Sequence, residues 1–323
     1  MSAQPCGTQP VQRTAQSSVP ELPDITVYIE ALSERVIAQR LTRVEVLSPF
    51  VLRTALPAMT QLEGSSVTEI RRLGKRIALG FDNDLWLVMH LMIAGRLAWA
   101  SRAKTGRGRN ILARLHFDTG VLTFTEAGTK KRASLHVLAG AAGLESLNTH
   151  GLETLACEIK EFRARLTQRN HTLKRALTDP RLFSGIGNAY SDEILHAAQL
   201  SPIQHTQKLS EVQIGTLFAA TLGTLNKWTG VLREARGGKF PAKVTAFRDG
   251  MAVHGRYGLP CPRCETAIQR IRYVSNELNY CPRCQTGGRI LADRALSRLL
   301  HKDWPRTIEE LEGGLSSSED LSG

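Results

Sequence analysis

Residues 184–193, Ser-Gly-Ile-Gly-Asn-Ala-Tyr-Ser-Asp-Glu, place two glycines and an asparagine immediately before an amphipathic helix. A turn of this kind exposes backbone N–H groups, and the positive end of the following helix adds to their attraction for an anion. The stretch therefore predicts an anion-binding turn in the second half of the chain. Taken alone, this pattern is weak evidence for any one function.

Four cysteines form two pairs farther along the chain. Cys261-Pro-Arg-Cys264 and Cys281-Pro-Arg-Cys284 are C-x2-C pairs separated by sixteen residues, a spacing that lets two turns present four thiolates to one Zn²⁺. A redox dithiol would need only one pair, and a disulfide framework is not expected in a chain of this size. We predict one structural zinc, since four protein ligands leave no open coordination position and the metal supplies folding energy to a small hairpin.

The chain is strongly basic. It carries 42 Lys+Arg against 30 Asp+Glu, a net charge of +12 and a pI near 9.7, which favours a polyanionic partner such as nucleic acid over an ordinary basic enzyme. Five arginines flank the cysteine pairs, and they either contact phosphates or form a solvated face: Arg263, Arg270, Arg272, Arg283 and Arg289. No apolar run reaches the ~18 residues of a membrane span, and no signal peptide is recognised, so we expect a cytoplasmic protein.

Hydrophobic periodicity predicts a helix, then a β-rich region, then further helices. The first helix follows Asp24, with apolar positions at Ile25, Tyr28, Ile29, Leu32 and Val36. The expected strands include Arg76–Phe81, Leu85–Leu91, Ile111–Phe117 and Val121–Phe124, in a sandwich or a barrel. The later helices are expected at Leu155–Leu166, Leu173–Leu177, Ala189–Ala198 and Val212–Trp228, and Ile308–Gly323 is expected to be a solvated acidic tail.

Several motifs occur in a fixed order and together resemble the formamidopyrimidine-DNA glycosylase / endonuclease VIII family from Pro20 to about Gln285. Besides residues 184–193 and the cysteine pairs, they are Pro20-Glu-Leu-Pro-Asp24, Arg72-Leu-Gly-Lys75-Arg, His90-Leu-Met-Ile-Ala-Gly95, Leu173-Lys174, Leu200-Ser-Pro202 and Val253-His-Gly-Arg-Tyr-Gly258. The resemblance implies an α+β multidomain fold with an N-terminal β-sandwich and flanking helices, a helical H2TH domain and a C-terminal zinc-finger hairpin. We place these at 20–140, 150–243 and 244–290, between a disordered extension at 1–19 and a C-terminal helix and acidic tail at 291–323.

The resemblance also implies a function. We expect a bifunctional DNA glycosylase/AP lyase of base excision repair that acts as a monomer on damaged double-stranded DNA, located in the cytoplasm with the nucleoid. Pro20 would form an iminium with the damaged nucleotide, Glu21 would handle protons and Lys75 would hold a phosphate. The further DNA contacts would come from Lys174, Asn188, Lys130, Lys131, Arg132 and Asn276. Read alone, Pro20-Glu21 is a loop dipeptide before a helix, and Lys75 a solvated strand lysine.

The chain departs from the family pattern at several positions. Ile93 replaces a methionine of the 8-oxoguanine-type members, Gly128-Thr-Lys-Lys-Arg132 stands in place of an Arg/Phe wedge loop, and Asn276 replaces an arginine. An internal Pro20 is a tertiary amide with no nucleophilic lone pair. We therefore expect residues 1–19 to be removed or to reflect a misassigned start, since a start codon at Val19 would yield Met-Pro-Glu.

Two other functions compete with the enzyme. A damaged-DNA-binding protein would keep the H2TH domain and the zinc finger without catalysis, as a blocked Pro20 and Asn276 both favour. A zinc-ribbon component of a transcription or RNA assembly would explain the cysteines and the charge but neither Pro20–Asp24 nor Gly185–Asn188. The lesion class, oxidised purine or pyrimidine, is left open by the sequence.

Overall fold

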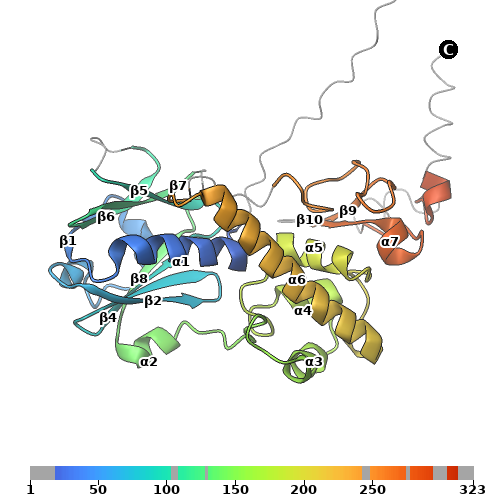
Figure 1. Cartoon of the computed structure of the whole chain (residues 1–323), viewed down its shortest axis with the longest axis horizontal. Coiled ribbons are helices and arrows are strands. Elements are labelled where there is room, and N and C mark those ends of the chain that lie inside the picture. Colours follow the sequence, from blue (N-terminus) through green and yellow to red (C-terminus); the bar gives the residue numbers. More distant parts are fainter. Residues whose placement is uncertain are drawn as a thin grey trace, which may run out of the picture.

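The protein is seen in a computed structural model that describes residues 19–102, 108–127, 130–241, 248–273, 277–293 and 304–311. The chain forms a β-rich N-terminal half and a C-terminal half of helices with a small hairpin module (Figure 1). The long helix α6, Glu211–Arg236, runs from beside α1 across the helical half. Nearly all of the extension predicted at 1–19 lies outside the described residues.

The N-terminal half is a sandwich of two antiparallel four-stranded sheets, in the orders β1-β6-β7-β5 and β2-β3-β4-β8. This confirms the predicted sandwich and excludes the barrel. The strands are β1 Leu41–Val46, β2 Val67–Leu73, β3 Arg76–Phe81, β4 Leu85–His90, β5 Gly95–Ala100, β6 Ile111–Phe117, β7 Gly120–Glu126 and β8 Ser134–Ala139. Four of them, β1, β2, β5 and β8, were not delimited from the sequence.

One apolar core fills the space between the sheets. Leu79 and Leu87 from one sheet and Leu115 and Phe124 from the other belong to the same buried cluster. The other face of the second sheet is covered by the short helix α2, Gly140–Glu145, through a separate cluster that includes Trp86. Both faces of β3 and β4 are therefore buried, which explains why these strands are continuous apolar runs in the sequence.

Short 3-10 turns lie between β1 and β2, at Pro49–Val51 and Met59–Leu62.

Helix α1, Leu22–Val36, lies against the sandwich and also contacts α6. Ile25, Tyr28 and Leu32 are fully buried in the sandwich core, as the 3.6-residue period predicts. The ion pair of Glu30 with Arg233 joins the outer side of α1 to α6. The start of α1, and with it Pro20 and Glu21, is thereby directed toward the helical half.

The helical half comprises α3 Ile159–Thr167, α4 Leu173–Thr178, α5 Asn188–Ala197, the 3-10 turn Thr206–Lys208 and α6. The predicted helix at Leu155–Leu166 was wrong at its start. Leu155 is exposed and Cys157 lies in the preceding turn, because the helix is capped at Glu158. The other helices lie where the sequence placed them, although α4, α5 and α6 differ from the predicted ends by one to eight residues.

The module with the cysteines contains the strands β9, Gln269–Arg272, and β10, Glu277–Tyr280, followed by α7, Pro282–Thr286. The chain returns to this module near its C-terminal end. Ile308 is buried, and its N–H donates to the carbonyl of Gly288. The prediction of a solvated tail was therefore wrong at its first residue, because the apolar side chain of Ile308 is buried. Among the described helices, none has the length and apolar character to cross a membrane.

Replacement of Leu79 tests the sandwich core. Leu79→Ala should lower the free energy of unfolding by about 2–5 kcal/mol, because a fully buried side chain is lost and a cavity remains. Urea unfolding, followed by tryptophan fluorescence, measures the change. The matched control is Leu56→Ala in the same half; Leu56 is 80% exposed, and the change should stay within about 0.5 kcal/mol. Equal midpoints for the two variants would contradict this core.

Candidate active site and zinc centre

The carboxylate of Glu21 lies against the first turn of α5. Its oxygens accept hydrogen bonds from the backbone N–H groups of Gly187 (2.6 Å), Ala189 (2.9 Å) and Tyr190 (3.3 Å). These N–H groups have no partner within the helix, and the helix dipole adds to their attraction for a negative charge. The anion-binding turn predicted from residues 184–193 therefore binds a carboxylate of the chain itself. A backbone bond from Leu22 N–H to Gly185 O reinforces the contact.

Both glycines of this turn are needed by its geometry. Gly185 has a φ of +81°, which side-chain-bearing residues rarely adopt. At Gly187, an added Cβ would lie 2.1 Å from Nζ of Lys75 and 2.6 Å from Cδ of Glu21. Gly187 is thus in close contact with both groups, and the missing side chain is what allows the N-terminal end, the lysine and α5 to meet.

Lys75 stands at the tip of the β2–β3 hairpin, where Gly74 takes the left-handed conformation of a tight turn. Burial lowers the pKa of its ammonium group, the charge of Glu21 opposes that shift and the charge of Lys174 adds to it. Arg72 anchors the same tip by donating to Gly74 O and to Ser184 Oγ. The lysine is therefore held close to Glu21, which the sequence alone did not show.

A buried ion pair supports the start of α1. Asp24 accepts the N–H of Glu21 at 2.9 Å and pairs with Arg248, which lies at the start of the zinc module, the described residues between 248 and 290. Burial raises the pKa of the Asp24 carboxyl, and the Arg248 guanidinium works against this rise. The peptide between Pro20 and Glu21 is consequently fixed in orientation, and Pro20 itself is buried.

Lys174 and Asn188, both predicted to contact DNA, have protein partners. The Lys174 ammonium donates to Asn188 O and pairs with Asp192, and the Asn188 amide donates to Glu277 O in β10. An ammonium has three protons, so Lys174 retains donor capacity beyond these two contacts. Asp192 also bonds to His254 Nδ1 at 2.8 Å.

The remaining predicted DNA contacts lie elsewhere. Lys130, Lys131 and Arg132 are exposed in the segment before β8, at the edge of the sandwich. The Lys131 ammonium turns back to Glu126 O, and the Arg132 N–H donates to Glu126 Oε1, so this segment is tied to the end of β7. Asn276, Gly128 and Thr129 lie outside the described residues.

The four cysteines of the two C-x2-C pairs come together as predicted. Their Sγ atoms all lie within 4.8 Å of one another, with separations of 3.4 Å for Cys264–Cys281 and Cys264–Cys284 and 3.9 Å for Cys261–Cys284. A tetrahedral site with Zn–S bonds of about 2.3 Å has S–S edges of about 3.8 Å, so the cluster fits one zinc ion. With four thiolates it is a structural site.

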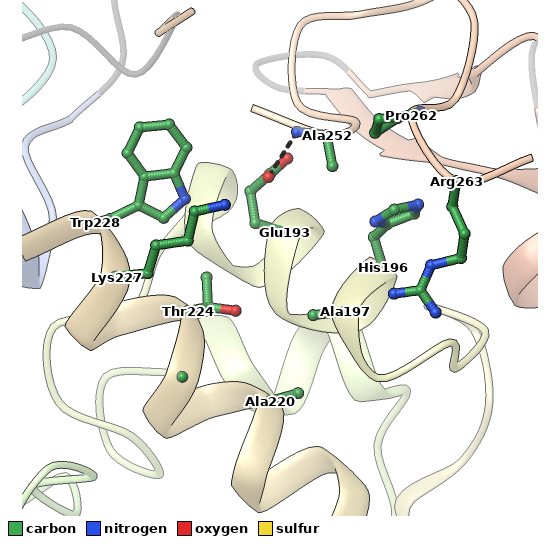
Figure 2. Close-up of a pocket in the computed structure, with 11 residues that line it drawn as sticks. Glu193, His196, Ala197, Ala220, Thr224, Lys227, Trp228, Ala252, Pro262 and Arg263 are labelled. Atoms are coloured by element: carbon green, nitrogen blue, oxygen red, sulfur yellow. Dashed lines mark hydrogen bonds between the residues drawn. The ribbon is translucent and has the colours of Figure 1, made fainter. Parts of the chain in front are cut away.

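Helix α5 contributes polar side chains to the same region. Glu193 accepts the N–H groups of Ala252, Val253 and His254 at 2.8–3.0 Å, and His196 Nε2 lies 3.2 Å from Cys261 Sγ. Burial, together with the charge of Arg263, lowers the pKa of His196 to about 4. Figure 2 shows Glu193 and His196 on the wall of a cavity of about 520 Å³ between α5, α6 and the zinc module.

No role for Asp192, Glu193, His196 or His254 was predicted from the sequence. The available signal was the acidic pair Asp192-Glu193 beside the apolar Ile194 and Leu195, because carboxylates that become buried need hydrogen-bond partners. Their partners, residues 252–254 and 261, follow about 60 residues later, and spacing alone does not reveal such contacts.

The curated relatives include a formamidopyrimidine-DNA glycosylase of Thermobifida fusca, which is 32% identical over 83% of this chain and 97% of its own length. The chain belongs to the formamidopyrimidine-DNA glycosylase family. Three domain families match in order: the formamidopyrimidine-DNA glycosylase N-terminal domain at residues 19–132, its H2TH domain at 151–235 and the zinc finger found in FPG and IleRS at 258–287. The matched zinc finger and the cysteine geometry agree on one structural zinc.

Two further similarities bear on this glycosylase-family chain. An uncharacterized formamidopyrimidine-DNA glycosylase-like protein of Mycobacterium tuberculosis is 38% identical over 49% of this chain and 99% of its own length. The Lactococcus lactis Fpg, solved as a complex with DNA that contains an abasic site, superposes with a TM-score of 0.73 at 25% identity, over 82% of this chain and 99% of that one.

Gly187→Ala tests the crowding at the turn of residues 184–193. We expect a loss of about 1–3 kcal/mol in stability, because the added methyl group overlaps Lys75 and Glu21. Gly223→Ala is the matched control, since Gly223 lies inside α6 with no atom within 4 Å of an added Cβ. That change should raise stability by about 0.5–1 kcal/mol. Thermal unfolding measures both, and shifts of the same sign would contradict the crowding.

A cysteine comparison tests the zinc centre. Cys264→Ser should lose zinc during dialysis against a mild chelator, because one of four thiolates is removed. Cys157→Ser should retain one zinc per chain, since Cys157 lies in the turn before α3. Metal analysis by mass spectrometry measures the zinc-to-protein ratio. Retention of zinc by the Cys264 variant would show that the metal does not need this ligand.

Proposed function

We propose that the protein is a bifunctional DNA glycosylase/AP lyase of base excision repair that removes oxidised bases from double-stranded DNA. The observation that carries this proposal is the meeting of Pro20-Glu21, Lys75 and the first turn of α5 at Gly187. A secondary amine, a carboxylate and an ammonium group are the components that covalent excision of a base would need.

The comparisons support DNA as the substrate. The curated relatives are named formamidopyrimidine-DNA glycosylases, and the Lactococcus lactis Fpg is found with DNA containing an abasic site and with DNA containing Fapy-dG. A target base in a duplex has to be rotated out of the stack at a cost of a few kcal/mol before chemistry can occur. Duplex DNA with a damaged base is therefore the partner that we assign to this chain.

In the proposed reaction, the Pro20 nitrogen attacks C1′ of the damaged nucleotide as the bond from C1′ to the base breaks, and the departing base takes up a proton. An α-amine has a pKa near 8, so a useful fraction is uncharged at neutral pH, unlike a lysine near 10.4. The C1′–O4′ bond of the resulting aminal then breaks, O4′ takes up a proton, and the nitrogen lone pair forms the C=N bond of the iminium. The iminium acidifies the C2′ protons. Loss of a C2′ proton then expels the 3′ phosphate, and a second elimination expels the 5′ phosphate.

Glu21 and Lys75 have complementary roles in this scheme. The Glu21 carboxylate, fixed by three backbone N–H groups, moves protons at the sugar or the base. The Lys75 ammonium binds a phosphate beside the lesion. Lys174, Asn188, Lys130, Lys131, Arg132 and Asn276 form the wider DNA contact, and zinc acts by maintaining the fold of its module. A single chain supplies both walls of the site, so we propose a monomer that works at the nucleoid.

A second candidate, a damaged-DNA-binding protein without catalysis, is favoured by one observation. Pro20 is buried and is joined to Val19 through an amide bond, and in that form its nitrogen has no lone pair for attack. Catalysis through Pro20 therefore requires a form of the protein that begins at Pro20, whether by removal of the preceding residues or by a start at Val19. The two candidates differ in a single measurable property, the formation of a covalent adduct with abasic DNA.

The experiment compares the chain from Met1 with a form that begins at Pro20, prepared by placing a methionine at position 19 that the host aminopeptidase removes. Both are incubated with abasic duplex DNA and sodium borohydride, which reduces an iminium to a stable cross-link. We expect cross-linking only for the form with a free Pro20 amine. In that form, Glu21→Gln should slow base excision by about 10²–10⁴-fold.

Peptide mapping of the cross-link identifies the nucleophile. An adduct on Pro20 supports the proposal, whereas an adduct on Lys75 would transfer the role to that lysine, whose pKa is already lowered by burial. Pro20→Gly keeps a free α-amine but makes it primary, and it should cross-link more slowly. DNA binding by the Pro20 form without any cross-link would establish the binding protein instead.

A further inference from the structure

One side chain that contacts the zinc cluster comes from outside the zinc module. His196 lies near the C-terminal end of α5, in the H2TH domain, and its Nε2 atom is 3.2 Å from Sγ of Cys261. Both residues are buried. The distance is within hydrogen-bond range for a sulfur acceptor, and the two residues are 65 positions apart in the chain.

The direction of this hydrogen bond follows from the chemistry of a zinc site. A cysteine that binds zinc is a thiolate without a proton, so Cys261 can only accept. The Nε2 atom of His196 must then carry the hydrogen, which fixes the tautomer of the ring whatever lies at Nδ1. The bond is charge-assisted, because the acceptor sulfur shares a full negative charge with the metal.

The remainder of α5 holds His196 in place. At its first turn, Asn188 donates to Glu277 O in β10; along its middle, Asp192 bonds to His254, and Glu193 accepts three backbone N–H groups of residues 252–254. The helix is thus bound to the zinc module over its whole length. A donor carried on such a helix has little freedom to move away from the sulfur.

The other side of the His196 ring faces open space. Figure 2 shows His196 on the wall of the cavity of about 520 Å³, between Ala197 and Arg263. The ring therefore separates solvent in the cavity from the buried sulfur of Cys261. The same open side leaves room for a replacement ring, which makes substitution at this position informative.

We propose that His196 is a positioning residue of the zinc centre, which donates an N–H···S hydrogen bond to the Cys261 thiolate and thereby makes the H2TH helix α5 part of the metal site. This inference concerns the metal centre alone and stands whichever reaction the protein catalyses. The bond withdraws electron density from the sulfur and shields it from the solvent in the cavity. Partners of metal ligands at comparable positions contribute about 10–100-fold to metal affinity.

The test uses the full-length protein loaded with zinc or with Co²⁺. His196→Phe removes the donor and keeps a planar ring, whereas His196→Gln keeps an N–H donor on a side chain of similar length. Zinc affinity is measured by competition with a chromogenic chelator. In the Co²⁺ form, the sulfur-to-metal charge-transfer band reports the electron density on the thiolates, and the band should move to lower energy when the hydrogen bond is lost.

We expect the Phe variant to bind zinc about 10–100-fold more weakly, with the charge-transfer band displaced, and the Gln variant to stay close to the unchanged protein. His205→Phe is the matched control, since His205 is exposed in the same half of the chain. Wild-type affinity and spectrum in the Phe variant would overturn the proposal. Equal losses in the Phe and Gln variants would also overturn it, because they would assign the effect to packing. If the Phe variant does not fold, His196→Met removes the donor on a more flexible side chain and carries the same comparison.

Discussion

The contact between the Glu21 carboxylate and the first turn of α5 is the interaction on which the candidate site depends. It joins the start of the β-rich half to the centre of the helical half, since the three N–H donors belong to residues 187–190. A carboxylate at a helix N-terminus is stabilised both by the free N–H groups and by the helix dipole. Together with the bond from Leu22 N–H to Gly185 O and the bond from Arg72 to Ser184, this contact fixes Pro20 and Lys75 relative to the H2TH domain.

Glu21 and Lys75 can approach α5 closely because Gly187 has no side chain. Two further contacts stabilise this arrangement. Arg72 links the tip of the β2–β3 hairpin to Ser184, and Arg248 links the start of α1 to the zinc module. Most charges around the site therefore have partners within the protein. Such preorganisation reduces the entropy lost when a substrate is bound, because the side chains are already in place.

Much of this arrangement could be predicted from the sequence. The features that could not be predicted have physical causes. The zinc ligands, the apolar face of α1 and the anion-binding turn follow from local spacing, which a single sequence contains. The sheet order, the burial of Ile308 and the partners of Glu193 depend on contacts between distant residues, and no local pattern encodes them. The start of α3 was misplaced because Leu155 continues the apolar period although it is exposed. Lys174 and Asn188 were predicted from the family resemblance to contact DNA, but their bonds to Asp192, Asn188 O and Glu277 O could not be inferred.

Glu21 and its backbone donors in α5 are far apart in the sequence, and this affects when their contact can form during synthesis. Glu21 meets donors that are 166 to 169 residues later in the chain, and domains generally fold as units while the chain emerges from the ribosome. The sandwich can therefore form while the Glu21 carboxylate still faces water, and the proposed catalytic arrangement closes only after α5 has been synthesised. This contact therefore cannot form until more than half of the 323-residue chain has been translated.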